Sequence, residues 1–109
     1  MSALFYFREK DVTNVIAESI QKARVAMSKR AFGESKALLD EVLSAEPDNF
    51  EGRYTLAVLH RAEGQPANAK VLLETLVAEK PDFGRGFQEL GLCELALKKE
   101  PAAITAFEQ

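Results

Sequence analysis

The chain is poor in the residues that most often carry chemistry. It has one cysteine, one histidine and no tryptophan among its 109 residues. The single cysteine, Cys93, excludes an intramolecular disulfide, so nothing indicates an oxidising compartment and we expect a cytoplasmic protein. No cysteines or histidines are paired at metal-ligand spacing, and no glycine-rich phosphate-binding motif occurs. The sequence therefore predicts neither a metal nor a cofactor.

An excess of basic charge and a long apolar run are also missing. Fourteen lysines and arginines stand against 17 aspartates and glutamates, which gives a net charge of −3. This balance disfavours binding to nucleic-acid phosphates and to anionic membrane surfaces. No apolar run approaches the roughly 18 residues that cross a bilayer, and the cluster from Leu4 to Phe7 is too short for a signal peptide. We expect neither nucleic acid nor a membrane as a partner.

What the chain does contain is an internal repeat. The segments A-E-P-D-N-F at 45–50 and A-E-K-P-D-F at 78–83 place Pro47 and Pro81 34 residues apart. The same offset aligns small residues with small ones and large apolar residues with large ones, which a chance match would not do. Periods of this length are typical of repeat arrays. The aligned sets are Ala23, Ala57 and Gly91, then Ser35, Ala69 and Ala103, and finally Leu39, Leu73 and Phe107.

Each repeat unit is predicted to be helical. Apolar residues from Val12 onward recur at the i, i+3, i+4 spacing of one helix face. No stretch alternates apolar and polar residues, so we expect an all-α fold. The predicted helices span 12–29, 33–45, 49–63, 67–79, 84–97 and 101–109.

Turn and capping residues separate these helices. Asp48 is predicted to cap the third helix, with Glu51 completing a capping box. Gly64 suits a left-handed helix end, and Pro66 suits the first turn of the next helix. Pro101 is predicted to open the last helix in the same way.

Short connections predict antiparallel helix hairpins that stack side by side. The small residues at 23, 57 and 91 would let paired helices approach closely. We therefore expect Gly91→Leu to overpack the third hairpin and destabilise it.

The second and third units carry the residues of a known repeat pattern. The sequence resembles the tetratricopeptide repeat, whose pattern is W-x2-L-G-x2-Y, then A-x3-F, then P. Departures are Ser19 and Arg53 at the aromatic position, and His60 in place of tyrosine. The matching residues are Leu56, Ala57, Ala69, Leu73 and Pro81, then Phe87, Leu90, Gly91, Ala103 and Phe107.

The resemblance implies an α-α superhelix of about three hairpins. They would cover about 15–49, 50–83 and 84–109, the last being truncated, so the array spans 12–109. Residues 1–11 form an apolar N-terminal extension. The truncated end indicates a fragment of a longer protein.

A concave groove lined by the first helix of each pair would follow from that architecture. It suits an extended peptide or a helix, so we interpret the chain as a non-enzymatic protein-interaction scaffold. We expect Arg61→Glu to alter partner binding with little effect on stability. The predicted groove residues are Ile20, Arg24, Tyr54, Thr55, Val58, Arg61, Arg85, Gln88, Glu89 and Leu92.

A family-level ligand can be tested against these residues. Co-chaperone members hold a C-terminal carboxylate with two lysines, two asparagines and an arginine. Only Arg85 keeps the charge expected at the matching positions, and Glu89 would repel a carboxylate there. We therefore reject that clamp. His60 and Cys93 are interpreted as structural residues, because no base or nucleophile partner is placed beside either.

Two alternatives remain open. The run P-D-F-G-R-G-F-Q-E-L-G at 81–91 resembles the N-terminal repeats of certain bacterial sulfotransferases, whose catalytic domain would lie beyond Gln109. The chain could instead self-associate through its uncapped last helix, which carries Ile104 and Phe107, or through the Leu4–Phe7 segment.

Overall fold

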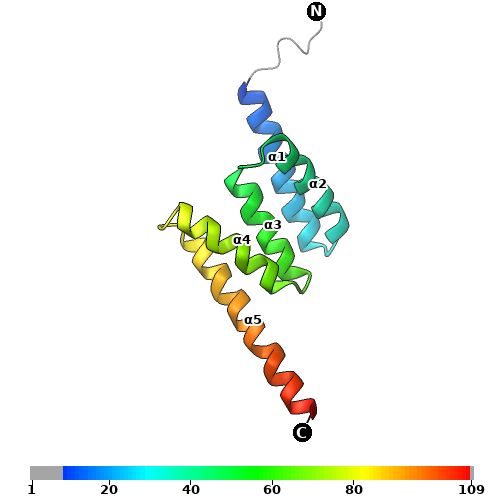
Figure 1. Cartoon of the computed structure of the whole chain (residues 1–109). Coiled ribbons are helices and arrows are strands. Elements are labelled where there is room, and N and C mark those ends of the chain that lie inside the picture. Colours follow the sequence, from blue (N-terminus) through cyan, green and yellow to red (C-terminus); the bar gives the residue numbers. More distant parts are fainter. Residues whose placement is uncertain (1–8, 109) are drawn as a thin grey trace, which may run out of the picture.

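A computed structural model describes the backbone of residues 9–108 and the side chains of residues 14–98. Within that range the chain forms five helices and no strand, which confirms the predicted all-α class. None of the described helices combines the length and the apolar character needed to cross a bilayer. The helices are α1 (Glu9–Ser28), α2 (Phe32–Ala45), α3 (Phe50–Ala62), α4 (Pro66–Glu79) and α5 (Gly84–Glu108) (Figure 1).

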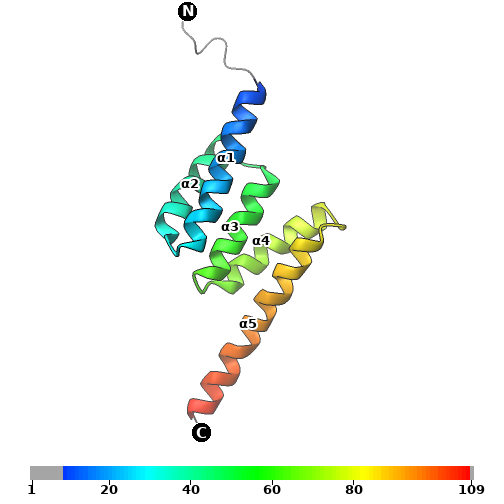
Figure 2. The same cartoon turned by 180° about the vertical axis from the view of Figure 1, so that it is seen from behind.

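The helices stack in chain order as hairpins. The pairs α1/α2 and α3/α4 lie side by side as hairpins, and the N-terminal half of α5 packs on α4 (Figures 1 and 2). Successive hairpins meet through α2 with α3, and the first helices meet through α1 with α3 and α3 with α5. Among the described residues, α2 does not contact α4 and α1 does not contact α5. Each hairpin is therefore covered only by its neighbours, as expected of a repeat array.

Small residues let the paired helices approach closely, as the 34-residue repeat predicts. Ala23 and Ser35 are fully buried between α1 and α2, and the Ser35 hydroxyl donates to the Ala23 carbonyl over 2.9 Å. Ala57 and Ala69 occupy the equivalent places in the second hairpin and are also fully buried. A larger side chain at these positions would separate the helices.

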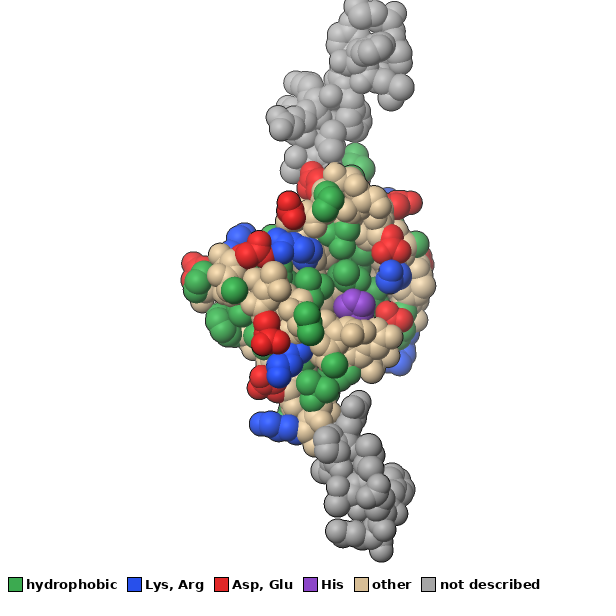
Figure 3. Space-filling model, in the orientation of Figure 1, with side chains coloured by type: hydrophobic (Ala, Val, Ile, Leu, Met, Phe, Trp, Pro, Cys, Tyr) green, Lys and Arg blue, Asp and Glu red, His purple; other side chains and the backbone are tan. Residues whose placement is uncertain are grey.

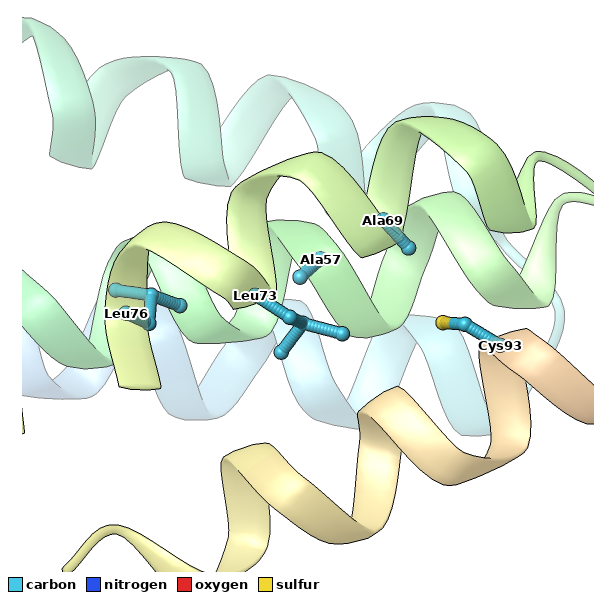
Figure 4. Close-up of a cluster of buried hydrophobic side chains, with 5 residues drawn as sticks. All are labelled: Ala57, Ala69, Leu73, Leu76 and Cys93. Atoms are coloured by element: carbon cyan, nitrogen blue, oxygen red, sulfur yellow. The ribbon is translucent and has the colours of Figure 1, made fainter. Parts of the chain in front are cut away.

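Leucines fill the space beside these small residues. Leu73 and Leu76 of α4 lie next to Ala57, with no exposed surface (Figure 4). Cys93 points into the same cluster from α5, so the thiol is part of the packing between the second hairpin and α5 (Figure 4). Leu39 has the equivalent buried position in the first hairpin.

The helix ends confirm the predicted roles of Gly64 and Pro66 and correct the predicted capping residue of α3. Gly64 has a φ of 80°, the left-handed conformation expected at a helix end, and Pro66 is the first residue of α4. The predicted cap at Asp48 is wrong, because the Asn49 side chain caps α3 by accepting from the Gly52 backbone N–H over 2.7 Å. Asn49 and Asp48 are both favourable caps, and the sequence alone does not separate neighbours of this kind.

The prediction of two separate helices at 84–97 and 101–109 is wrong. One helix, α5, runs from Gly84 to Glu108 and includes Pro101. The equivalent positions Arg30 and Gly64 have positive φ in the turns of the first two hairpins, whereas Lys98 lies inside α5. Within residues 9–108, no second helix then covers Gly91, and an added Cβ there would meet nothing within 4 Å. The expected overpacking by Gly91→Leu is therefore not supported.

Some predictions fall outside the described residues. The Leu4–Phe7 segment lies before the described chain, and the side chains of Ala103, Ile104 and Phe107 are not described. The helix α1 begins at Glu9, slightly earlier than expected.

Candidate binding groove

The first helices of the array border a hollow of about 510 Å³. Its wall is made by the C-terminal half of α1, one face of α3 and the first turns of α5. Because α3 contacts both α1 and α5, the hollow crosses the junction between successive hairpins. The lining residues are Arg24, Met27, Ser28, Tyr54, Thr55, Val58, Arg61, Ala62, Arg85 and Glu89.

A shared carboxylate links all three helices at one end of the hollow. Arg24 of α1 donates to one oxygen of Glu51 over 2.8 Å, and Arg85 of α5 donates to the other oxygen. Glu51 lies in the first turn of α3, where the helix dipole favours a negative charge. One carboxylate facing two guanidinium groups leaves an excess of positive charge at this end.

A second ion pair ties α3 to α5 more tightly. Arg61 donates to both oxygens of Glu89, over 2.7 Å from Nε and 3.1 Å from Nη2. Glu89 is only 8% exposed, so the bidentate pair provides the partner that its buried carboxylate needs. The hydrogen bond to Glu89 raises the pKa of Arg61 above its ordinary value, which keeps the guanidinium charged.

The floor between these ion pairs is formed by α3. Val58 and Tyr54 contribute apolar surface, while Thr55 is almost fully buried and donates its hydroxyl to the Glu51 carbonyl over 2.7 Å. Burial, together with the negative charge of Glu89, raises the pKa of Tyr54 above its ordinary value of 10.0. The phenol is therefore neutral at physiological pH and can donate a hydrogen bond to a ligand.

The predicted groove residues fall into three groups in the structure. Ile20 is 4% exposed and packs with Ile16 and Val42, although it also borders a shallower hollow next to Arg24. Gln88 and Leu92 are exposed on α5 and do not line the main hollow. The residues that the structure brings together around it are Arg24, Tyr54, Thr55, Val58, Arg61, Arg85 and Glu89.

An aromatic cluster beside the groove was missed by sequence reasoning. The Phe83 ring meets Phe50 and Tyr54 edge to face, with centroids 4.8 and 5.1 Å apart. The guanidinium of Arg85 lies 5.0 Å from the Tyr54 ring centroid and 5.1 Å from that of Phe83. The cluster thus holds Arg85 toward the groove. The available signal was the phenylalanine that ends both the A-E-P-D-N-F and the A-E-K-P-D-F segments.

The two residues considered for chemistry have structural surroundings. His60 lies at the surface, where its Nδ1 is 3.3 Å from the Gln65 side-chain oxygen, and the face in Figure 3 shows it among mixed side chains. Cys93 is fully buried, and burial raises the pKa of its thiol, so a reactive thiolate is disfavoured. Within residues that the structure describes, no group of three histidine, cysteine, aspartate or glutamate side chains is arranged for a metal.

A profile of the tetratricopeptide repeat matches residues 26–90, more than half of the chain. The chain belongs to the tetratricopeptide repeat family. The resemblance inferred from Leu56, Ala57 and the aligned prolines is thereby confirmed. Comparison with curated proteins found no match, and neither did comparison with solved structures. Tetratricopeptide repeats generally mediate protein–protein interaction and are typically non-catalytic scaffolds.

Proposed function

We propose that this tetratricopeptide repeat segment is an interaction module that binds a peptide or helix in the groove between α1, α3 and α5. The observation that carries the proposal is the hollow of about 510 Å³, with an apolar floor between two charged clusters. A volume of this size accommodates a few side chains of a peptide. The general role of the family in protein–protein interaction supports the same conclusion.

The apolar floor determines which side chain anchors the ligand. Met27, Tyr54 and Val58 are partly exposed and face the hollow from α1 and α3. A large apolar side chain placed between them would remove this surface from water, at about 25 cal/mol per Å². The Tyr54 hydroxyl can then hydrogen-bond to the ligand backbone. We therefore expect a leucine, methionine or aromatic residue as the anchor.

The charges determine which residues flank that anchor. Three guanidinium groups, those of Arg24, Arg61 and Arg85, face two carboxylates, those of Glu51 and Glu89. The groove thus carries one excess positive charge on a chain whose net charge is −3. An aspartate or glutamate beside the anchor would offset the excess at Arg24 and Arg85, and its contribution would weaken as salt is raised.

A displayed library of random dodecapeptides, selected on the purified chain, tests this function. The expected consensus has one large apolar residue next to an acidic one, and binding that weakens with salt. Val58→Asp should reduce the affinity for selected peptides about tenfold or more, because it places a charge in the floor. Val71→Asp is the matched control, since Val71 is 68% exposed on α4 and outside the groove.

Two results would contradict the proposal. One is a library that yields no consensus, and the other is a set of peptides that bind equally well to wild type and to Val58→Asp. Circular dichroism of both aspartate variants checks that each keeps its helices. A cytoplasmic location, self-association and a sulfotransferase domain beyond Gln109 stay predictions, and the sequence of the full gene would test the last of these.

A further inference from the structure

The helix α5 has an apolar stripe on a face that the other described helices leave open. Phe87 is 50% exposed and Leu95 is 52% exposed, and Gly91 lies between them, four residues from each, on the same side of the helix. An added Cβ at Gly91 would meet nothing within 4 Å. Figures 1 and 2 show the C-terminal half of α5 extending away from the other helices. The Phe87–Gly91–Leu95 stripe is therefore open to contact with another molecule.

The first two hairpins show which kind of helix covers this face. Ala23 and Ala57, the repeat equivalents of Gly91, are fully buried where α2 packs on α1 and α4 packs on α3. Each covering helix presents a small residue and, four positions later, a leucine. The two pairs, all without exposed surface, are Ser35 with Leu39 in α2 and Ala69 with Leu73 in α4.

The stripe itself carries the same pattern of a small residue and a leucine. Gly91 is followed four positions later by Leu95. The α5 helix of a second copy, running antiparallel, can place its own Gly91 against Gly91 of the first copy. Phe87 of each copy then lies level with Leu95 of the other, because an antiparallel two-fold contact matches positions on opposite sides of its centre. The surface is thus complementary to itself.

The charges beside the stripe do not oppose such pairing. Glu94 and Lys98 are both exposed, have opposite signs and are four residues apart. The Glu94 carboxylate also lies 3.9 Å from the Lys70 ammonium of α4. The neighbourhood of the stripe therefore brings no excess of negative charge into the contact, although the whole chain carries a net charge of −3.

The other end of the array is interrupted by charge. On α1, Glu18 is exposed at the position of Gly52, where an added Cβ would lie 3.1 Å from the Val42 side chain. Lys22 is exposed at the position of Leu56, which packs against the core of the first hairpin. Burying charged side chains at such close-contact positions is costly. Two copies are therefore better matched through α5 than head to tail.

We propose that the Phe87–Gly91–Leu95 stripe joins two copies of this chain as an antiparallel pair of α5 helices, with the two-fold axis at Gly91. Pairing over residues 84–98 is about 21 Å long. The contact is centred on two partly exposed apolar side chains per copy, so it falls short of the roughly 800 Å² per partner of a standard stable complex. The dimer is therefore reversible. It uses none of the residues that line the main hollow, so it is independent of the proposed groove function.

Sedimentation velocity of the purified chain, from micromolar to submillimolar concentration, tests the dimer. We expect the average mass to rise from monomer to dimer and no further. Leu95→Glu should raise the dissociation constant about tenfold or more, because it places a charge in the contact. Val71→Glu is the matched control, since Val71 is 68% exposed on α4 and lies outside the stripe.

A second variant tests the close approach at the axis. Gly91→Gln should also weaken the dimer about tenfold or more, because a long side chain on the two-fold axis keeps the helices apart. The monomer should keep its fold, since an added Cβ at Gly91 meets nothing within 4 Å. Circular dichroism of all three variants checks their helix content.

A spin label at Gly84 measures the orientation of the pair. Gly84→Cys with Cys93→Ala gives one label per chain, and an added Cβ at Gly84 meets nothing within 4 Å. In the antiparallel pair the two labelled backbones are about 21 Å apart along the helices and about 9 Å across, which gives about 23 Å. A parallel pair would bring them to about 9 Å. Pulsed electron paramagnetic resonance separates the two, and sedimentation checks that the labelled chain dimerises.

Several results would overturn the proposal. A chain that stays monomeric at submillimolar concentration forms no such dimer. A dimer that resists Leu95→Glu and Gly91→Gln, or that Val71→Glu weakens equally, uses another surface. A mass that grows beyond the dimer indicates head-to-tail stacking, and a label separation that differs from about 23 Å excludes the antiparallel pair centred on Gly91.

Discussion

At the scale of single residues, two glycines of α5 have opposite environments. A Cβ added at Gly86 would lie 2.7 Å from the Phe83 ring and 2.9 Å from Val77, so α5 packs on the preceding turn and on α4 because residue 86 lacks a side chain. Gly91 has no such neighbour. Gly52 is crowded less severely: an added Cβ would lie 3.1 Å from the Val42 side chain and 3.2 Å from the Leu43 side chain. Glycine at 52 and 86 therefore serves the contact between hairpins.

We predict opposite effects for the two alanine substitutions on α5. Gly86→Ala should lower the free energy of unfolding by about 1–3 kcal/mol, because the methyl group overpacks the Phe83 and Val77 contact. Gly91→Ala should raise it by about 0.5–1 kcal/mol through helix propensity alone. Urea unfolding followed by circular dichroism measures both. Equal shifts of the same sign would contradict the assigned packing.

A second prediction concerns the pH dependence of stability. The hydrogen bond from Arg53 lowers the pKa of Glu79 below its ordinary value of 4.5, and the two oxygens of Glu79 lie 2.6 and 3.2 Å from the Arg53 guanidinium. A lowered folded-state pKa stabilises the fold above the unfolded pKa, and the contribution is lost as pH falls through the folded value.

Melting temperatures measured from about pH 6 to about pH 2 should show this loss, and Glu79→Gln should make the decline shallower. Glu74→Gln provides a control on the same helix, since Glu74 is exposed and has no ion-pair partner among the described residues. The assignment fails if both variants decline as steeply as the wild type.

At the scale of helices, the caps differ in how they are made. The Asn49 side chain accepts a backbone hydrogen bond at the start of α3, whereas Gln65 at the start of α4 makes no such bond. Pro66 compensates at α4, because its missing N–H would be unsatisfied there anyway. The two helix starts are therefore stabilised by different means within an otherwise repeated architecture.

Asn49→Ala should accordingly destabilise the protein by about 1 kcal/mol, the usual effect of removing a side-chain cap. Gln65→Ala, the matched change at the other helix start, should cost much less. Chemical denaturation of both variants gives the comparison. If Gln65→Ala were the more damaging of the two, the Asn49 cap would not be the stabilising contact at α3.

At the scale of the whole molecule, ion pairs between first helices hold successive hairpins in register. Glu51 joins α3 to α1 and α5 through Arg24 and Arg85, and Arg61 joins α3 to α5 through Glu89. These contacts run along the groove, while the leucine and alanine contacts fill the core of each hairpin. The surface that is proposed to bind a partner therefore also contributes to the stacking.

The sequence-based expectation that Arg61→Glu leaves stability nearly intact is not supported by this arrangement. The substitution removes the partner of Glu89, which is 8% exposed, and places a second carboxylate beside it. We predict a loss of about 2 kcal/mol or more.

Lys36→Glu is the control, because it reverses charge in the exposed Lys36–Asp40 pair of α2 and should cost about 0.5 kcal/mol or less. Thermal melts of the two variants measure their losses of stability. Similar losses would show that the buried Glu89 carboxylate does not depend on Arg61 for its stabilisation.

The repeat, the helical class and the packed small residues could all be read from the chain. They depend on residue size at a fixed spacing: Ala23 and Ala57 must be small, and Leu39 and Leu73 large, wherever paired helices meet. Gly64 was predictable for a similar reason, since a left-handed turn selects glycine locally. Such features follow from properties that each residue expresses within its own helix or turn.

The remaining features depend on residues that meet only after folding. Glu51 forms ion pairs with Arg24 and Arg85, which come from helices on either side of α3. No sequence pattern within one helix predicts these ion pairs. Pro101 is compatible with the first turn of a helix, which is why a helix start was predicted there, yet α5 runs through it to Glu108. Spacing along the chain therefore specifies the first two hairpins, whereas the arrangement of charges in the groove is decided by how the helices are stacked, because its ion pairs join residues of different helices.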